Sequence, residues 1–260
     1  MIKRDNRKAT VMYSQTFSLY SDAVEDDYQV SVWLPPDYES SDKPLPVLYL
    51  LDAPEFFGFA TGVVLLHLLD EALPSMIIVG IGKHMENLDS WWELRWRDYS
   101  PAHVESHPLS GQASTFYELL TGEIIPFVDE NFRTNPDDRA LYGHSLSGVF
   151  TLYAMQRRAN VFKRYIATSP AFVAAGETIL PYENGLSGRD FQGRKLYVAV
   201  SDAEPEFKPY VDIFAKTVQQ NDYPGLDFTY EIIEGIEHTP ASTLAFIKGL
   251  RTVFLQARSV

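Results

Sequence analysis

The chain has 260 residues, of which 45% are hydrophobic and 22% are charged, and its formal net charge is −13. This composition excludes a disordered chain, and the acidic balance argues against a nucleic-acid partner, because binding phosphates requires clustered lysine and arginine. Cysteine is absent, which excludes disulfides, a thiol nucleophile and thiolate metal ligands. The length suits a single α/β domain, and we expect one domain over residues 1–260.

The sequence carries no membrane or export signal. No stretch approaches the roughly 20 apolar residues that a membrane-spanning helix needs. The basic segment 1–14 is not followed by an apolar run of the length that a secretory signal requires. We therefore expect a cytoplasmic protein without a membrane partner, and we find no pattern that favours a particular oligomeric state.

Strands and helices are predicted to alternate along the chain. Residues 28–34 show the alternation of a half-buried strand, and two prolines then end it. Continuous apolar runs, typical of strands buried on both faces of a mostly parallel sheet, follow at 46–51, 76–82, 139–143, 164–168, 195–200 and 228–233. Helical patterns lie at 55–72, 114–130, 146–159, 209–221 and 243–256. We predict an α/β fold with a doubly wound, mostly parallel sheet, preceded by an antiparallel N-terminal strand pair.

Two long segments, 83–113 and 170–194, have no clear pattern and are expected to be loops. Each follows a predicted strand, and ligands in open α/β sheets bind beyond the carboxyl ends of the strands. Loops of this length inside a compact domain usually have a function or carry minor structure of their own. We expect both segments to line the active site.

The stretch 141–148, LYGHSLSG, places Ser145 between a predicted strand and a predicted helix. This is the context of a nucleophile elbow, in which a sharp turn lifts the serine hydroxyl above the sheet and the next backbone N–H, that of Leu146, points at a developing oxyanion. Gly143 relieves crowding in such a turn. The usual G-x-S-x-G pattern is imperfect, because Ser147 occupies the position of its second glycine. Ser147 is an alternative nucleophile, and an ordinary turn with a serine helix cap is the non-catalytic interpretation.

A serine nucleophile needs a base and an orienting acid, and in this fold class the chain order is serine, acid, histidine. His238 follows the last predicted strand and is the candidate base. Asp202, Glu204 and Glu206 follow the preceding strand and are candidate acids, although each could also cap the next helix.

The remaining histidines have weaker interpretations. His103 and His107 have the spacing of two metal ligands on a helix, but prolines bracket the segment and no third ligand is evident, so we expect no metal. His67 is expected to pack in an apolar helix, and His144 is the variable residue of the elbow.

Several stretches, in the same order along the chain, resemble the putative esterase family of α/β-hydrolases, also called the esterase D or enterochelin-esterase-like family. The similar stretches are DYQVSVWLPPDY, PVLYLLDAPEFF, MIIVGIG, RWRDYSP, YGHSLSGVFTLYAM and EHTPASTLAFIKGLRTVF. The resemblance implies the α/β-hydrolase fold, with Ser145 and His238 catalytic and Glu204 as the acid. Asp202 stays possible, because Ser201 replaces the glycine usual in the acid's motif. The turn after PVLYLL supplies the second oxyanion donor, for which Ala53 is the candidate.

These features predict a serine esterase that works through an acyl-enzyme intermediate on a small-molecule ester, without metal or organic cofactor. A thioesterase or S-acyl-glutathione hydrolase with the same triad is one alternative, and a non-catalytic hydrolase-like binding module is another. Candidate substrate-binding residues are Trp91, Trp92, Arg95, Trp96, Arg97 and His144. The tryptophans and arginines could instead pack against the domain, with the arginines paired to Glu93 or Asp98.

Overall fold

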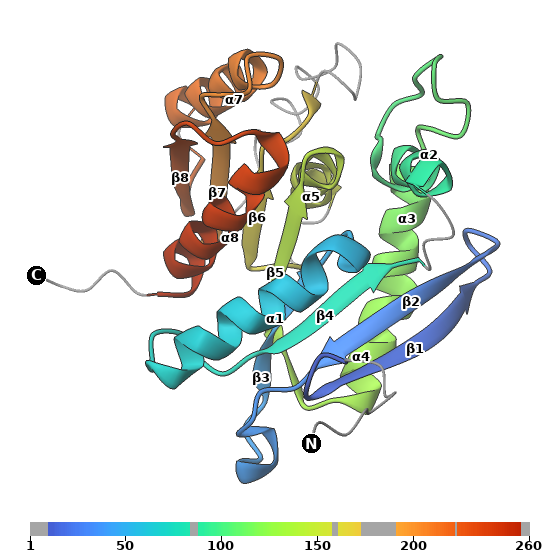
Figure 1. The fold of residues 1–260 in the computed structure, drawn as a ribbon, viewed down its shortest axis with the longest axis vertical. Helices are drawn as coiled ribbons and strands as arrows, with labels where there is room; N and C mark the ends of the chain where they lie inside the picture. The colour runs from blue at the N-terminus through green and yellow to red at the C-terminus, as the bar shows by residue number, and fades with distance from the viewer. Residues whose placement is uncertain (1–9, 84–87, 158–160, 173–190, 222, 256–260) are drawn as a thin grey trace, which may run out of the picture.

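A computed structural model describes residues 10–83, 88–157, 161–172, 191–221 and 223–255 of the protein. Within these ranges the chain forms a single eight-stranded sheet with the strand order β1-β2-β4-β3-β5-β6-β7-β8 (Figure 1). The strands are β1 (Ser14–Ser21), β2 (Asp26–Trp33), β3 (Leu45–Leu50), β4 (Ile77–Gly82), β5 (Thr134–His144), β6 (Arg164–Thr168), β7 (Arg194–Ser201) and β8 (Leu226–Ile233).

Strands β3 to β8 are parallel to one another, whereas β2 runs antiparallel to both β1 and β4. The predicted mostly parallel sheet with an antiparallel N-terminal strand pair is therefore confirmed. Because the parallel strands all end at one edge, the residues that follow them gather there. That edge is where the candidate active-site residues lie.

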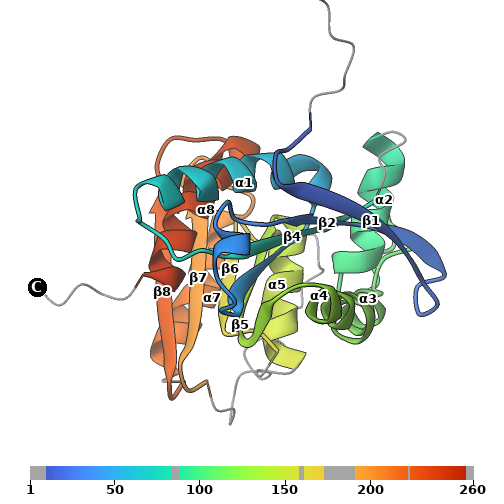
Figure 2. The ribbon, with the colours of Figure 1, turned by 90° about the horizontal axis from the view of Figure 1, so that it is seen from below.

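Helices cover both faces of the sheet (Figure 2). On one face pack α1 (Ala53–Leu69) and α8 (His238–Phe254). On the other face pack α3 (Ala113–Leu119), the π-helical turn η2 (Leu120–Ile124), α4 (Ile125–Asn131), α5 (Leu146–Arg157) and α7 (Lys208–Gln220). A short 3-10 turn, η1 (Tyr38–Ser40), lies between β2 and β3.

The central strands are buried on both faces, which explains their continuous apolar sequences. All five residues 77–81 of β4 are buried, as are all but the first residue of β6. The edge strand β1 is different, because only some of its side chains, including Phe17 and Leu19, pack against the core. Its polar alternate residues face away from the core, as expected for a strand at the edge of a sheet.

The prediction of a loop over 83–113 is wrong in its middle part, because Leu88–Tyr99 form helix α2, which packs beside α3 and α5. The helical pattern was hidden because the buried face of α2 includes charged side chains. Trp91, Arg95 and Asp98 are all buried on that face, at the spacing of successive helical turns. A search for apolar periodicity therefore misses this helix.

Two other boundaries differ from expectation. The helix predicted from residue 243 begins at His238, five residues earlier, and the helix predicted over 114–130 is interrupted by the π-helical turn η2. Of the second predicted loop, 170–194, residues 173–190 lie outside the described part of the chain. In the described ranges, none of the helices has the length and apolar character that crossing a membrane requires.

Candidate active site

Ser145 lies at the corner between β5 and α5 with a backbone φ of +60°, in the left-handed region that L-residues rarely adopt. Holding a non-glycine residue there costs about 1–2 kcal/mol, and such strain is typical of functional sites. Gly143 makes the turn possible, because a Cβ at this position would lie only 2.1 Å from the Ser147 carbonyl oxygen. The strand-turn-helix geometry of the nucleophile elbow is therefore present at Ser145.

Ser147, the alternative nucleophile, is fully buried and hydrogen-bonded. Its Oγ lies 2.7 Å from Asp52 Oδ2 and accepts the His144 backbone N–H at 2.9 Å. A hydroxyl held in this way by a buried carboxylate is not available to attack a substrate. The geometry therefore favours Ser145 over Ser147 as the reactive serine.

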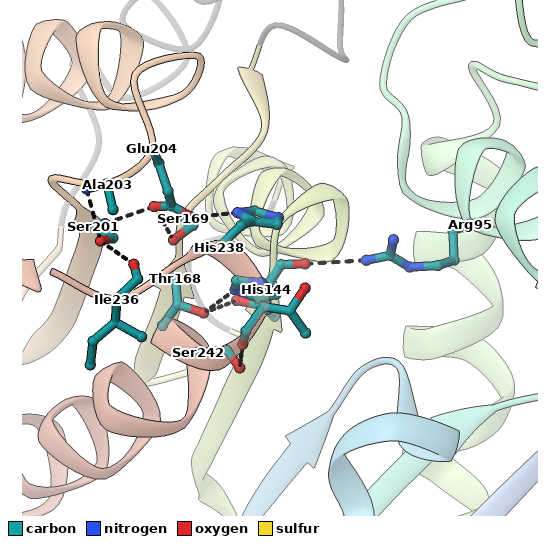
Figure 3. Close-up of polar contacts among 12 residues, drawn as sticks. Arg95, His144, Thr168, Ser169, Ser201, Ala203, Glu204, Ile236, His238 and Ser242 are labelled. Carbon is teal, nitrogen blue, oxygen red and sulfur yellow. Dashed lines mark hydrogen bonds and ion pairs between the residues drawn. The ribbon is translucent and has the colours of Figure 1, made fainter.

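Glu204 and His238 are brought together at the carboxyl ends of the neighbouring strands β7 and β8 (Figure 3). The His238 Nδ1 atom is hydrogen-bonded to Glu204 Oε1, and Glu204 is fully buried. The other carboxylate oxygen accepts hydrogen bonds from Ser169 Oγ at 2.8 Å and from the Ser201 backbone N–H at 2.7 Å. These bonds fix the carboxylate, which in turn orients the imidazole. The hydrogen bond to Glu204 uses Nδ1, so the Nε2 atom of the ring is left to exchange a proton with another group.

The other two candidate acids are exposed, and among the described residues neither has a hydrogen bond or ion pair to His238. Asp202 Oδ1 instead accepts the Gly235 backbone N–H at 2.7 Å and so links the turns that follow β7 and β8. The geometry thus pairs His238 with Glu204 rather than with Asp202 or Glu206.

The His238 ring contacts two other aromatic rings. The centroids of His144 and Phe207 are each 4.6 Å from the His238 centroid, both at an interplanar angle of 36°. His144 is itself buried, and its Nδ1 lies 3.0 Å from Thr168 Oγ1. Burial, with smaller contributions from the nearby His238 and Arg95, lowers the pKa of His144 well below its usual value. This candidate substrate-binding residue therefore supports His238 from beneath as a neutral ring.

Among the hydrogen bonds of the described residues, none joins the Ser145 hydroxyl to His238. His144, the residue before Ser145, packs its ring against the His238 ring. Catalytic hydrogen bonds in sites without substrate are often long and shorten in the complex.

The two candidate oxyanion donors occupy equivalent places in the fold. Ala53 is the first residue of α1 and Leu146 the first of α5, and each follows a residue with positive φ, Asp52 at +55° and Ser145 at +60°. Neither backbone N–H donates to another described residue. Free N–H groups at helix N-termini stabilise negative charge, as a developing oxyanion requires.

The arginines of α2 are engaged within the protein. Arg95 forms two hydrogen bonds of 2.9 Å to the Asp52 carboxylate. Arg97 donates to Asp98 at 2.7 Å and to Asp26 at 2.8 Å. Pairing of Arg97 with Asp98 agrees with the packing interpretation, whereas the partner of Arg95 was not foreseen. Neither guanidinium is a free cation for a substrate.

The three tryptophans of α2 have different surroundings. Trp91 is buried, and Trp96 stacks on His107 with centroids 3.9 Å apart. Trp92 is 47% exposed, and the Arg95 guanidinium carbon lies 4.9 Å from its ring centre. Trp92 is therefore the member of this cluster with most surface to offer a ligand.

The candidate metal-binding pair has another role. His107 stacks on Trp96 and its Nδ1 lies 3.1 Å from Glu93 Oε1, which ties the segment after α2 back to that helix. Within the ranges that the structure describes, no three histidine, aspartate or glutamate side chains gather in a way that could hold a metal ion.

Two contributors to this site were missed from the sequence, Asp52 and Ser169. Asp52 follows the apolar run that contains β3, and this sequence position indicates that it lies at the carboxyl-terminal edge of the sheet, where ligands bind in this class of fold. Ser169 likewise follows β6, at a positive φ of +43°. No local sequence signal identifies Arg95 or Glu204 as their partners.

The sheet topology and the strained serine define the α/β-hydrolase fold, and comparison with solved structures agrees. The BES protein from Bacillus cereus superposes with a TM-score of 0.87 at 21% identity, covering 97% of this chain and 100% of that one. The siderophore hydrolase EstB from Aspergillus nidulans superposes with a TM-score of 0.83 at 20% identity, covering 95% and 97% of the two chains.

The model of the family described as Putative esterase matches residues 21–233, and the chain belongs to this family. It is 29% identical over 139 residues to the ferri-bacillibactin esterase BesA of Bacillus subtilis. It is 26% identical over 207 residues to the apo-salmochelin esterase of Escherichia coli. These alignments cover 48% and 75% of this chain, but only 47% and 63% of the two relatives. The chain thus spans roughly half to two thirds of each of these relatives.

Proposed function

We propose that the protein is a serine hydrolase that cleaves carboxylic esters through an acyl-enzyme intermediate. The observation that carries this proposal is the combination of a strained serine at the β5–α5 corner with a half-buried histidine that is hydrogen-bonded to a buried glutamate after β7 and β8. Together they supply a nucleophile, a base and an orienting acid at one edge of the sheet.

In the proposed reaction, His238 Nε2 takes the proton from Ser145 Oγ as this oxygen bonds to the ester carbonyl carbon. The N–H groups of Leu146 and Ala53 hold the negative charge on the carbonyl oxygen. His238 then gives the proton to the departing alcohol, leaving an acyl group on Ser145. Water, deprotonated by the same histidine, attacks the acyl group and releases the acid.

Glu204 keeps the His238 proton on Nδ1 and stabilises the imidazolium that forms during each proton transfer. Its hydrogen bonds from Ser169 and Ser201 support this role, because they hold the carboxylate in place while the charge on the imidazole changes.

For the substrate, we propose an ester of the siderophore type. Three relatives are named as esterases of ferri-bacillibactin, apo-salmochelin and the siderophore triacetylfusarinine C. Because Arg95 and Arg97 are ion-paired within the protein, such a ligand would be recognised on α2 through aromatic contact with Trp92 rather than through free positive charge.

The test is intact-mass analysis after exposure to a fluorophosphonate, run on wild type, Ser145→Ala and Ser147→Ala. We expect one adduct at the end point of the reaction, absent only from Ser145→Ala. Turnover of a catechol siderophore ester is then compared with that of a simple carboxylic ester and its matched thioester. Absence of an adduct on folded wild-type protein would refute the hydrolase and favour a binding module, and preferential thioester turnover would make it a thioesterase.

A further inference from the structure

A bridge of three buried polar side chains, Asp52, Arg95 and Ser147, connects the turn after β3 with the turn after β5. All three are almost inaccessible to solvent. Arg95 Nε donates to Asp52 Oδ1 and Arg95 Nη2 to Asp52 Oδ2, both at 2.9 Å. Ser147 Oγ lies 2.7 Å from Asp52 Oδ2. One carboxylate therefore contacts both a helix that covers the site and the helix that follows the candidate nucleophile.

The bridge also holds the residue before the nucleophile on both sides. The His144 backbone N–H donates to Ser147 Oγ at 2.9 Å, and its carbonyl oxygen accepts from Arg95 Nη2 at 3.3 Å (Figure 3). The next N–H, that of Ser145, donates to the Thr168 carbonyl at 2.9 Å. The peptide plane between residues 144 and 145 is thus fixed at its oxygen and at its nitrogen. Fixing this plane helps to maintain the left-handed φ of Ser145.

At its other end the bridge fixes the second strained turn. Asp52, at a φ of +55°, accepts the N–H groups of Glu55 and Phe56 on its carbonyl oxygen and so begins α1. The candidate oxyanion donor Ala53 is the next residue. The hydrogen bond between the Asp52 carboxylate and Ser147 Oγ therefore helps to set the distance between the backbone N–H groups of Ala53 and Leu146.

Burying a charged pair is costly, and such pairs are weak evidence for stability. Apolar residues could fill this space, so the bridge is better explained by a demand for precise geometry. Ser147 supports this explanation, since it stands where the elbow pattern usually has glycine and only a side chain can supply the hydroxyl.

We infer that Asp52, Arg95 and Ser147 are positioning residues that set the geometry of the nucleophile and of the two oxyanion donors. This inference rests on the proposed ester hydrolysis. It gives Ser147 and Arg95 a role in catalysis without contact with the substrate.

The test compares Ser147→Ala and Arg95→Lys with wild type on a p-nitrophenyl ester. It measures kcat, KM and the inhibition constant of a trifluoromethyl ketone, which becomes tetrahedral on the serine and needs the oxyanion donors. We expect kcat to fall about 10-fold for Ser147→Ala and about 100-fold for Arg95→Lys, with KM within about threefold of wild type. The inhibition constant is expected to rise in proportion to the loss of kcat/KM.

Two matched controls remove similar groups elsewhere. Thr61→Val deletes a buried hydroxyl whose one hydrogen bond among the described residues is to the Gly58 carbonyl in α1. Arg164→Lys alters a half-buried, ion-paired arginine at the opposite end of the parallel strands. Both are expected to lower the unfolding temperature while leaving kcat and the inhibition constant unchanged.

If Ser147→Ala and Arg95→Lys behave like these controls in an active enzyme, the bridge is merely structural and the inference is wrong, while the proposed function stands. Should Arg95→Lys fail to fold, Ser147→Ala decides the outcome alone. If folded wild type neither turns over esters nor forms an adduct, the proposed function fails and the inference fails with it.

Discussion

The two halves of the candidate active site are built in different ways. In the nucleophile half, at the ends of β3 and β5, the backbone supplies the reactive geometry through strained residues and helix N-termini. In the acid-base half, at the ends of β7 and β8, side chains supply it through the contact of Glu204 with His238. The first half should therefore be most sensitive to changes of shape, and the second to changes of hydrogen bonding.

The difference also explains where the buried charges lie. The nucleophile half uses the Asp52–Arg95 pair to hold two strained turns, whereas in the acid-base half the fixed carboxylate itself contacts the histidine. His144 joins the two halves, since its backbone belongs to the elbow and its ring packs on His238.

The largest effect is expected from Glu204→Gln, which keeps the size of the side chain but removes the charge that orients His238. We expect kcat for ester hydrolysis to fall by about 10³-fold or more, because the imidazole loses its preferred tautomer and its stabilising charge. Asp202→Asn is the matched control, because Asp202 contacts only the Gly235 N–H, and kcat should change less than about threefold. The reverse order of effects, measured by steady-state kinetics, would assign the acid to Asp202.

Gly143→Ala tests the dependence of the nucleophile half on shape. The added Cβ would lie 2.1 Å from the Ser147 carbonyl oxygen, so we expect a loss of about 3 kcal/mol or more in the free energy of unfolding. Gly148→Ala is milder, because its Cβ would lie 3.1 Å from the Thr168 carbonyl oxygen, and about 1 kcal/mol is expected. Urea denaturation measures both, and equal losses would show that the elbow can relax.

Much of this arrangement could be predicted from the sequence because the signals are local. Continuous apolar runs identify strands buried on both faces, and a serine placed directly between such a strand and a helix indicates the elbow. The chain order of Ser145, Glu204 and His238 selects the candidate triad, although their catalytic roles stay predictions.

What could not be predicted depends on contacts between distant segments. Helix α2 escapes sequence prediction because it buries Arg95 and Asp98, which bond Asp52 and Tyr28 of other segments. The choice between Glu204 and Asp202 likewise depends on which carboxylate the turn after β7 directs at His238. Propensity and periodicity carry no information about such pairings.

The junction residue His144 predicts a pH effect on stability. Its pKa is lowered by burial, so the folded protein leaves it neutral at a pH where the unfolded chain binds a proton. Its contribution to stability therefore falls as pH drops below about 6.5, by up to about 1.4 kcal/mol per pH unit. Urea denaturation between pH 5 and 8 should show a smaller loss at low pH for His144→Phe than for wild type. Parallel curves for the two proteins would contradict the assignment.

The smallest effect is expected at Phe207, whose ring also packs against the His238 ring. Phe207→Leu keeps an apolar side chain but removes the aromatic face that lies 4.6 Å from the His238 centroid. An aromatic face stabilises a neighbouring cation by about 0.5–1 kcal/mol, so we expect kcat to fall about two- to fivefold with little change in KM. Phe214→Leu, in the helix α7 that follows Phe207, is the control, because the Phe214 ring contacts Phe172 instead, and it should lower the unfolding temperature without affecting kcat. An unchanged kcat in Phe207→Leu would mean that the hydrogen bond to Glu204 alone holds the histidine, which would sharpen the contrast between the two halves of the site.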